Sequence, residues 1–190
     1  MPERRAVFLD RDGTIVEDPP PGYLHDPAKV RLLPGAAEGI RQLNSAGFLV
    51  VTVSNQSGIA RGLYTVADYQ AVQRRLEQLL KAHSARLDGA YLCPHHPDFT
   101  GPCDCRKPGT RLFRDAAAAL GIDLARSWFV GDRLSDVAPA EALGGRGLLV
   151  TTGGGKEGGA TEAAARSRGV SVVGDLTAAA ALIVRDSATG

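Results

Sequence analysis

The chain has 190 residues, and its 22 lysines and arginines against 21 aspartates and glutamates give a formal net charge of +1. This balance excludes a broad positive field for nucleic acid or an anionic membrane, so any recognition of an anion has to be local. The length suits one domain with a substantial core, and no apolar run reaches the ~20 residues that span a bilayer. Because the first motif begins close to the amino terminus, we expect no signal peptide and a cytoplasmic, reducing location.

A short apolar run at residues 6–9 predicts the first strand, which delivers Asp10 and Asp12 to a turn at Gly13. Apolar runs bounded by turn residues are typical of buried strands. Open α/β sheets bind ligands at the carboxyl ends of their strands, and residues two apart in a strand point the same way. The two carboxylates are therefore expected to face one site. Acids also end strands because turns are polar, so the pair alone leaves both interpretations open.

The rest of the chain alternates predicted helices and strands. Further strands are predicted at 48–54, 89–93, 127–131, 147–151 and 170–173. Helices are predicted between Gly35 and Gly47, between Thr65 and Leu87, between Gly109 and Gly121, between Ser135 and Gly144, and from about Thr177. The alternation predicts a doubly wound parallel α/β sheet. Thr65 with Asp68 resembles a capping box, and Pro139 is expected in the first turn of its helix. The run 152–159 is predicted to be flexible.

Polar groups of matching chemistry stand at the ends of these strands. Asp10 and Asp12 follow the first strand, Ser54 ends the second, Asp132 follows the fourth, and Lys107 precedes the helix that leads to the fourth. Three carboxylates without a pair of histidines favour a hard cation, Mg²⁺ rather than Zn²⁺. A lysine and a hydroxyl beside that cation would neutralise and orient a phosphoryl group. Such groups at four places along one sheet edge favour a catalytic site over unrelated helix caps and a surface lysine.

Four ordered motifs carry a family resemblance: Phe8-Leu9-Asp10-Arg11-Asp12-Gly13-Thr14, Ser54-Asn55-Gln56, Lys107 and Gly131-Asp132-Arg133-Leu134-Ser135-Asp136. Together they resemble the motifs of haloacid-dehalogenase-like phosphatases over residues 6–151. The resemblance implies the Rossmann-like fold of that family, with Asp10 as nucleophile and Asp12 as general acid and base. It also implies magnesium held by Asp10, the Asp12 carbonyl and Asp132, and an aspartyl-phosphate intermediate that divides hydrolysis into two easier steps. Short spacings between the motifs leave no room for a cap domain.

Three cysteines and two histidines follow the third strand, in Cys93-Pro94-His95-His96-Pro97 and Cys103-Asp104-Cys105. In a reducing compartment such cysteines are thiols or metal ligands rather than a disulfide framework. Three sulfurs with one imidazole, from His95 or His96, make a closed set suited to a structural zinc; three reduced thiols in a loop are the alternative. A closed site has no vacancy for water. Its expected role is to clasp loop 93–105 and hold Arg106 and Lys107 at the active site.

The cysteine loop followed by Arg-Lys-Pro resembles two branches of the family, the heptose-bisphosphate phosphatases and the histidinol-phosphate phosphatase domains. The segments 54–62 and 93–97 are similar to the heptose branch, and the match indicates His95 as the zinc ligand. The resemblance then implies removal of the 7-phosphate of a heptose 1,7-bisphosphate, in nucleotide-activated heptose biosynthesis. We expect one monomeric domain over residues 1–190 that acts on a small phosphorylated sugar, without nucleic acid or membrane. A zinc-containing binding module without catalysis is the non-enzyme alternative.

The candidate substrate-binding residues come from the loops at the same sheet edge. They are Asp18, Gly22, Tyr23, Ser54, Asn55, Gln56, Ser57, Arg61, Arg106, Lys107 and Arg133. The planar fork of arginine suits a second phosphate that is held while another is cleaved. The resemblance departs from the family pattern at the prolines 19–21 and at Arg133, where a lysine is common. Both departures lie where the protein would contact the sugar, so the sequence does not predict which anomer is preferred.

Overall fold

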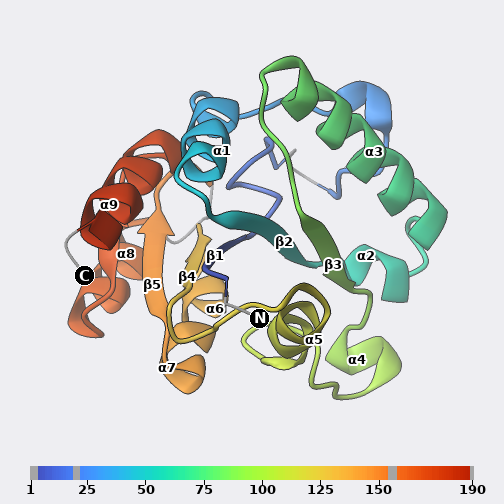
Figure 1. The fold of residues 1–190 in the computed structure, drawn as a ribbon. Helices are drawn as coiled ribbons and strands as arrows, with labels where there is room; N and C mark the ends of the chain where they lie inside the picture. The colour runs from blue at the N-terminus through green and yellow to red at the C-terminus, as the bar shows by residue number, and fades with distance from the viewer. Residues whose placement is uncertain (1–3, 19–21, 154–157, 189–190) are drawn as a thin grey trace.

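The computed structural model describes residues 4–18, 22–153 and 158–188. These residues form a six-stranded parallel sheet in the order β3-β2-β1-β4-β5-β6 (Figure 1). The strands are β1 (Ala6–Leu9), β2 (Leu49–Asn55), β3 (Gly89–Cys93), β4 (Trp128–Gly131), β5 (Arg146–Val150) and β6 (Ser171–Val173). The chain starts in the middle of the sheet, winds outward to β3, and returns to the other side of β1 for β4. This order confirms the doubly wound prediction.

Helices cover both faces of the sheet (Figure 1). They are the 3-10 turn η1 (Pro27–Lys29) and the α-helices α1 (Ala36–Ser45), α2 (Ser57–Ala60), α3 (Val66–Ala82), α4 (Pro97–Thr100), α5 (Arg111–Leu120), α6 (Leu134–Val137), α7 (Pro139–Leu143), α8 (Gly158–Ser167) and α9 (Leu176–Ala188). Successive strand residues point to opposite faces. Val7 and Leu9 accordingly share a core with α1, α3 and α9, whereas Ala6 and Phe8 share one with α5 and α7. Among the described residues no helix is both long and apolar enough to cross a membrane.

The connections explain why the polar strand ends meet. β1 pairs with β2 on one side and with β4 on the other, so the crossovers run in opposite directions from the centre of the sheet. Such a reversal leaves a crevice at the carboxyl ends of the two central strands, which is where open α/β sheets bind ligands. Within the described residues, only η1 and α1 lie between β1 and β2, and only α2 and α3 between β2 and β3. This agrees with the prediction that no cap domain is present.

Two predicted helices differ from the structure in their bounds. The capping box of Thr65 and Asp68 is present, but α3 ends at Ala82 rather than at Leu87. The helix predicted at 135–144 is divided into α6 and α7, because Pro139 begins a new helix directly after the one that ends at Val137. A proline has no amide hydrogen to donate and its ring clashes with the carbonyl four residues earlier, so it is tolerated at a helix start and not in the interior.

Among the described residues, the helices α2, α4 and α8 and the 3-10 turn η1 were not predicted. α2 lies between the predicted strand 48–54 and the helix predicted from Thr65, and α4 lies in the cysteine loop. α8 begins within the run 152–159, which was predicted to be flexible. α8 forms because small residues can pack closely: Ala165 is fully buried in a cluster with Leu149 of β5 and Val137 of α6. Residues 154–157 of the run predicted to be flexible lie outside the described residues.

Candidate active site

The turn after β1 holds Asp10 against β4. The Asp10 amide donates to the Val130 carbonyl at 2.9 Å, which continues the β1–β4 pairing by one residue. Gly13 follows with a φ of +86°, and a Cβ there would lie 2.7 Å from Asp132 Oδ2. Only glycine suits this left-handed position beside a carboxylate. The turn thereby brings the end of β1 against Asp132, which follows β4.

Three buried carboxylates, Asp10, Asp132 and Asp136, meet at this turn. Each offers one oxygen within 4.8 Å of the others, and Asp132 Oδ1 has no hydrogen-bond partner among the described residues. Burial, followed by neighbouring acids, raises the pKa of Asp132 to about 6. Burial also raises the pKa of Asp10 to about 8, against the lowering effect of Lys107. Buried carboxylates repel one another when they are ionised, and a bound divalent cation would offset that repulsion. Asp132 Oδ1, which has no hydrogen-bond partner among the described residues, is free to bind such a cation.

Lys107 stands between two of these acids. Its Nζ donates to Asp10 Oδ1 at 2.8 Å and to the Val53 carbonyl at 2.6 Å, and lies 2.7 Å from Asp136 Oδ1. Burial by itself would lower the pKa of Lys107, but the carboxylates of Asp10 and Asp136 outweigh it and raise the pKa. The ammonium therefore stays charged beside the candidate nucleophile. Sequence reasoning named Asp136 in the fourth motif but gave it no role; the structure makes it a partner of Lys107.

Asn55 fixes the backbone of Lys107. Its Oδ1 accepts from the Lys107 amide at 3.0 Å, and its Nδ2 donates to the Lys107 carbonyl at 3.1 Å. This two-sided clamp joins the end of β2 to a residue that is 52 positions away in the sequence. Asn55, predicted as a substrate contact, thus also positions the lysine.

The Asp12 side chain lies apart from the carboxylate cluster. Gln56 Nε2 donates to Asp12 Oδ2 and to Ser54 Oγ, both at 2.7 Å, and the Tyr64 hydroxyl donates to Gln56 Oε1. Arg11 approaches Asp12 from another side, with Nη2 3.0 Å from Oδ2. Asp12 is thus held by amide and guanidinium donors. Sequence reasoning missed Tyr64, which no motif marks.

These side chains line a pocket of about 400 Å³. Its walls are formed by Asp10, Asp12, Asp18, Gly22, Tyr23, Leu24, Ser54, Asn55, Gln56, Ser57, Arg106, Lys107, Arg133, Ser135 and Asp136. The structure therefore brings together every predicted substrate-binding residue except Arg61, and adds Leu24, Ser135 and Asp136. Arg61 Nη2 lies 2.9 Å from His96 Nε2, and its guanidinium stacks 5.0 Å from the ring centre of Phe99. The side chain of Arg61 thus contacts the cysteine loop.

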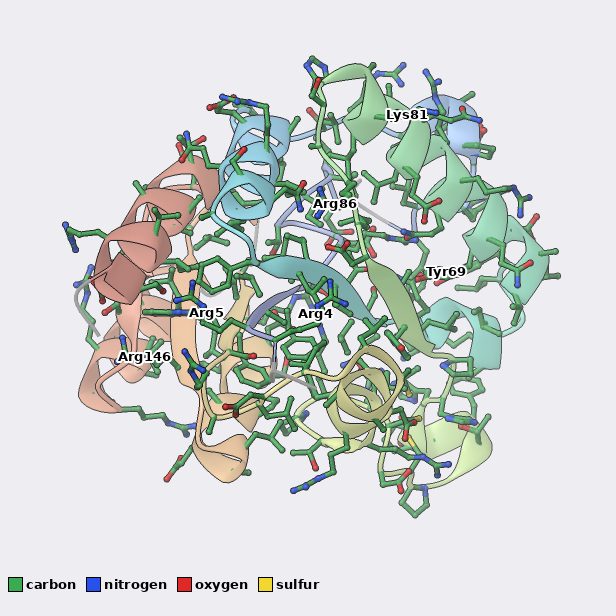
Figure 2. The ribbon with its side chains drawn as sticks, viewed as in Figure 1. Arg4, Arg5, Tyr69, Lys81, Arg86 and Arg146 are labelled. Atoms are coloured by element: carbon green, nitrogen blue, oxygen red, sulfur yellow. The ribbon has the colours of Figure 1, made fainter. Side chains whose placement is uncertain are left out.

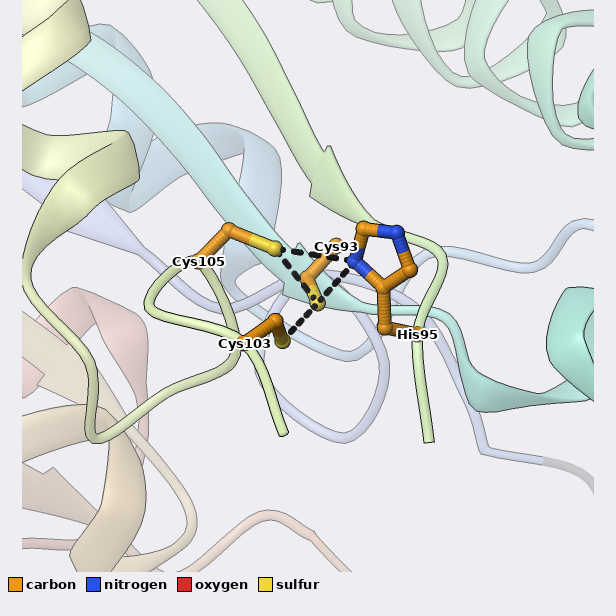
Figure 3. Close-up of side chains that lie close together, drawn as sticks. All are labelled: Cys93, His95, Cys103 and Cys105. Carbon is orange, nitrogen blue, oxygen red and sulfur yellow. Dashed lines mark hydrogen bonds between the residues drawn. The ribbon is translucent and has the colours of Figure 1, made fainter. Parts of the chain in front are cut away.

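That loop carries a second cluster, shown in Figure 3. Cys93, His95, Cys103 and Cys105 each offer a ligand atom within 4.8 Å of the others. Cys105 Sγ lies 3.0 Å from Cys93 Sγ and 3.2 Å from His95 Nδ1. All three cysteines are free thiols, and burial raises the pKa of Cys93 and of Cys105. A soft divalent cation would offset that cost and hold both as thiolates, so the donor set fits zinc.

The two neighbouring histidines have different partners. His95 joins the thiols, whereas His96 Nδ1 accepts from the Asp98 amide at 3.2 Å and its Nε2 contacts Arg61. His96 thus serves the start of α4. Of the two histidines that the residue pattern left open, His95 is the one that lies beside the thiols. Arg106 follows the cluster directly and its Nη1 donates to the His95 carbonyl at 3.4 Å, so the cluster adjoins the pocket wall.

Comparisons with known proteins agree with this geometry. A family model described as HAD-hydrolase-like matches residues 104–179. A D-glycero-beta-D-manno-heptose-1,7-bisphosphate 7-phosphatase of Escherichia coli O6:H1 is 44% identical over 154 residues, which cover 78% of this chain and 80% of that protein. A crystal structure of D,D-heptose 1,7-bisphosphate phosphatase from B. bronchiseptica, complexed with magnesium and phosphate, is 34% identical, with a TM-score of 0.85 and coverage of 96% of this chain and 99% of that one. The same enzyme from Burkholderia thailandensis is 34% identical, with a TM-score of 0.68 and coverage of 93% and 96%.

Proposed function

This chain belongs to the D,D-heptose 1,7-bisphosphate phosphatases of the haloacid dehalogenase superfamily, and from that premise we propose that it removes the 7-phosphate of D-glycero-D-manno-heptose 1,7-bisphosphate. The observation that carries the proposal is the pairing of Asp10 with a charged, buried Lys107 in a pocket whose wall includes Arg106. A nucleophile, a charge-neutralising ammonium and a second anion-binding group are what a bisphosphate substrate needs.

The mechanism assigns one step to each acid. The Asp10 carboxylate attacks the phosphorus of the 7-phosphate, and the bond from phosphorus to the sugar oxygen breaks. Asp12 gives its proton to that leaving oxygen, which avoids release of an alkoxide. In the second step Asp12 takes a proton from water, the water oxygen attacks the phosphorus of the aspartyl-phosphate, and Asp10 is released with inorganic phosphate. The side chains of Ser54 and Lys107 offset the charge of the transferring group.

The carboxylate cluster fits the magnesium that the relative from B. bronchiseptica contains. Asp10, Asp132 and the Asp12 carbonyl would hold the ion, which supplies positive charge beside the phosphoryl oxygens. Asp136 keeps Lys107 charged and in place, at 2.7 Å from its Nζ. In this proposal Asp136 is a positioning residue rather than a metal ligand.

The thiol cluster holds one structural zinc through Cys93, His95, Cys103 and Cys105. Its support is the closed set of four donors and the position of Arg106 and Lys107 directly after Cys105. Loop 93–105 is then a clasp within a single domain of residues 1–190. The proposed location is the cytoplasm, because metal-binding thiols suit a reducing compartment better than an oxidising one. The proposed state is a monomer.

Arg106 holds the 1-phosphate while the 7-phosphate is cleaved. Arg106 lines the pocket and is the neighbour of Lys107 in the sequence. A small substrate could therefore contact the guanidinium with one phosphate and the reaction centre with the other. The sugar lies against the other pocket residues, between Tyr23 and the ion pair of Asp18 with Arg133, whose Oδ2 and Nη2 are 3.4 Å apart. Histidinol phosphate, the alternative substrate, carries an ammonium group that would meet these arginines unfavourably.

The test compares kcat/KM for heptose 1,7-bisphosphate and for histidinol phosphate, with the position of the remaining phosphate identified by phosphorus NMR. We expect preference for the bisphosphate and a product that retains the 1-phosphate. Preference for histidinol phosphate, or release of the 1-phosphate, would contradict the assignment. Magnesium-dependent release of phosphate from a generic aryl phosphate separates either enzyme from a zinc-containing binding module, which would release none.

A further inference from the structure

Arg11 lies between the two candidate catalytic aspartates and is completely buried, with 0% of its surface exposed. A buried guanidinium costs several kcal/mol unless it is paired and hydrogen-bonded. Arg11 is buried despite this cost and lies within the catalytic motif, so we examined which residues pair with its guanidinium. Arg11 is not among the residues that line the pocket, so contact with substrate does not explain its position.

The guanidinium grips the Asp12 carboxylate as a fork. Arg11 Nε lies 3.2 Å from both Asp12 oxygens, and Nη2 lies 3.0 Å from Oδ2. Two donors in one plane fix the plane of a carboxylate, whereas a single hydrogen bond leaves it free to rotate. Gln56 supplies only one further donor to Asp12, at 2.7 Å. The orientation of the Asp12 carboxylate therefore depends chiefly on Arg11.

The ring of Tyr69 holds the guanidinium in turn. Tyr69 lies on α3, and its ring centre is 4.8 Å from Arg11 Cζ, within the range of a cation–π interaction. Figure 2 labels Tyr69 beside α3. A helix outside the catalytic motifs is thus coupled to Asp12 through one aromatic ring.

We propose that Arg11 is a positioning residue that aims the Asp12 carboxylate at the leaving oxygen and then at water, with Tyr69 as the surface that holds the guanidinium in place. The inference rests on the proposed function, since it presumes that Asp12 transfers the protons. Proton transfer requires hydrogen-bond reach and correct alignment, and a displacement of about 1 Å can cost about 100-fold in rate. Both steps of the reaction depend on the same carboxylate, so both depend on its orientation.

The decisive experiment is a double-mutant cycle between Arg11→Met and Asp12→Asn, read as kcat on a slow alkyl phosphate. We expect Arg11→Met to lower kcat roughly 10- to 100-fold, with KM changed less than about threefold. In the Asp12→Asn background the same change should have almost no further effect, because the carboxylate to be aimed is gone. Equal losses in both backgrounds, or an unchanged kcat, would overturn the inference. Full activity of Asp12→Asn alone would instead overturn the role that the proposed function gives to Asp12.

Two further variants keep the inference testable if Arg11→Met folds poorly. Arg11→Lys restores the charge without the fork, so kcat should recover only in part; complete recovery would mean that charge and not orientation matters. Tyr69→Leu removes the ring beneath the guanidinium and should lower kcat about 3- to 10-fold at constant KM, and no change would remove Tyr69 from the proposal. The matched control is Arg5→Met, which removes another arginine–aromatic stack, 4.7 Å from the Phe48 ring centre at the other end of β1, and should leave kcat unchanged.

Discussion

The carboxylate cluster and the thiol cluster are built alike and held differently. In each, ligand atoms from separate residues lie within 4.8 Å of one another. The carboxylates of Asp10 and Asp132 follow β1 and β4, two central strands with buried side chains on both faces of the sheet. The thiols follow β3 at the edge of the sheet, in a loop whose short helix α4 is exposed throughout.

The difference indicates which of the two proposed ions would serve structure and which would serve chemistry. The pairing of β1 with β4 positions the backbone of Asp10 and Asp132, so the proposed magnesium is not needed to hold these residues in place. The cysteine loop carries an exposed helix, so the proposed zinc would contribute to folding there, as structural zinc sites do. Arg106 and Lys107 connect the two regions, because they directly follow Cys105 of the thiol cluster and also line the pocket.

The largest effect is expected from Asp10→Asn, which should lower kcat at least about 1,000-fold because an amide cannot act as the attacking carboxylate. The variant should keep its zinc and its fold, since the sheet and not the acid positions the strands. Steady-state kinetics, zinc analysis and thermal unfolding check the three statements. Retention of more than about a thousandth of the wild-type rate would remove Asp10 as nucleophile.

Chelation should separate the two ions. A brief exposure to EDTA is expected to abolish turnover, and added Mg²⁺ should restore it fully, because Asp10 and Asp12 of the proposed magnesium site line the pocket. About one equivalent of zinc should remain bound throughout, since four protein ligands enclose it. Elemental analysis before and after chelation measures both metals. Protein purified without added metal that contains no zinc and has freely titrating thiols would refute the structural clasp.

Arg106→Ala probes the joint between the two regions. Loss of a charge-assisted contact to the 1-phosphate should lower kcat/KM for the bisphosphate about 10- to 100-fold, and that for a generic monophosphate far less. Arg61→Ala is the matched control, because Arg61 contacts the cysteine loop and lies outside the pocket wall. Equal losses on both substrates would mean that Arg106 serves the reaction centre.

The smallest effect on kcat is expected from Cys103→Ser, which should act mainly on stability. Without the full ligand set the loop should lose the proposed zinc, and we expect Tm to fall by roughly 10 °C. At about 2–4 °C per kcal/mol, this fall corresponds to a loss of about 3–5 kcal/mol in the free energy of unfolding. Well below Tm, kcat should fall only a few-fold, through looser placement of Arg106 and Lys107. Thermal unfolding with and without added zinc measures this. A Tm equal to that of the wild type would show that the loop is stable without the cluster.

The sequence by itself determined the fold class and most of the candidate site. Strand ends are marked by local chemistry, an apolar run followed by a turn, and therefore Asp10, Ser54 and Asp132 could be assigned to one sheet edge before any coordinates. The spacing of the cysteines likewise predicted a four-ligand cluster. The same local rules predicted the capping box of α3.

Only the tertiary structure decided which side chains touch. Lys107 Nζ reaches Asp10 across 97 positions of sequence, and no periodicity encodes that it also meets Asp136. The same holds for Arg11. The sequence shows that an arginine stands within the motif, but its burial beneath the ring of Tyr69 depends on how α3 packs on the sheet. The choice of His95 over His96, and the contact of Arg61 with the latter, were set by the path of the cysteine loop. Local patterns specify elements and their ends, whereas contacts between distant side chains arise from packing, which depends on the whole chain at once.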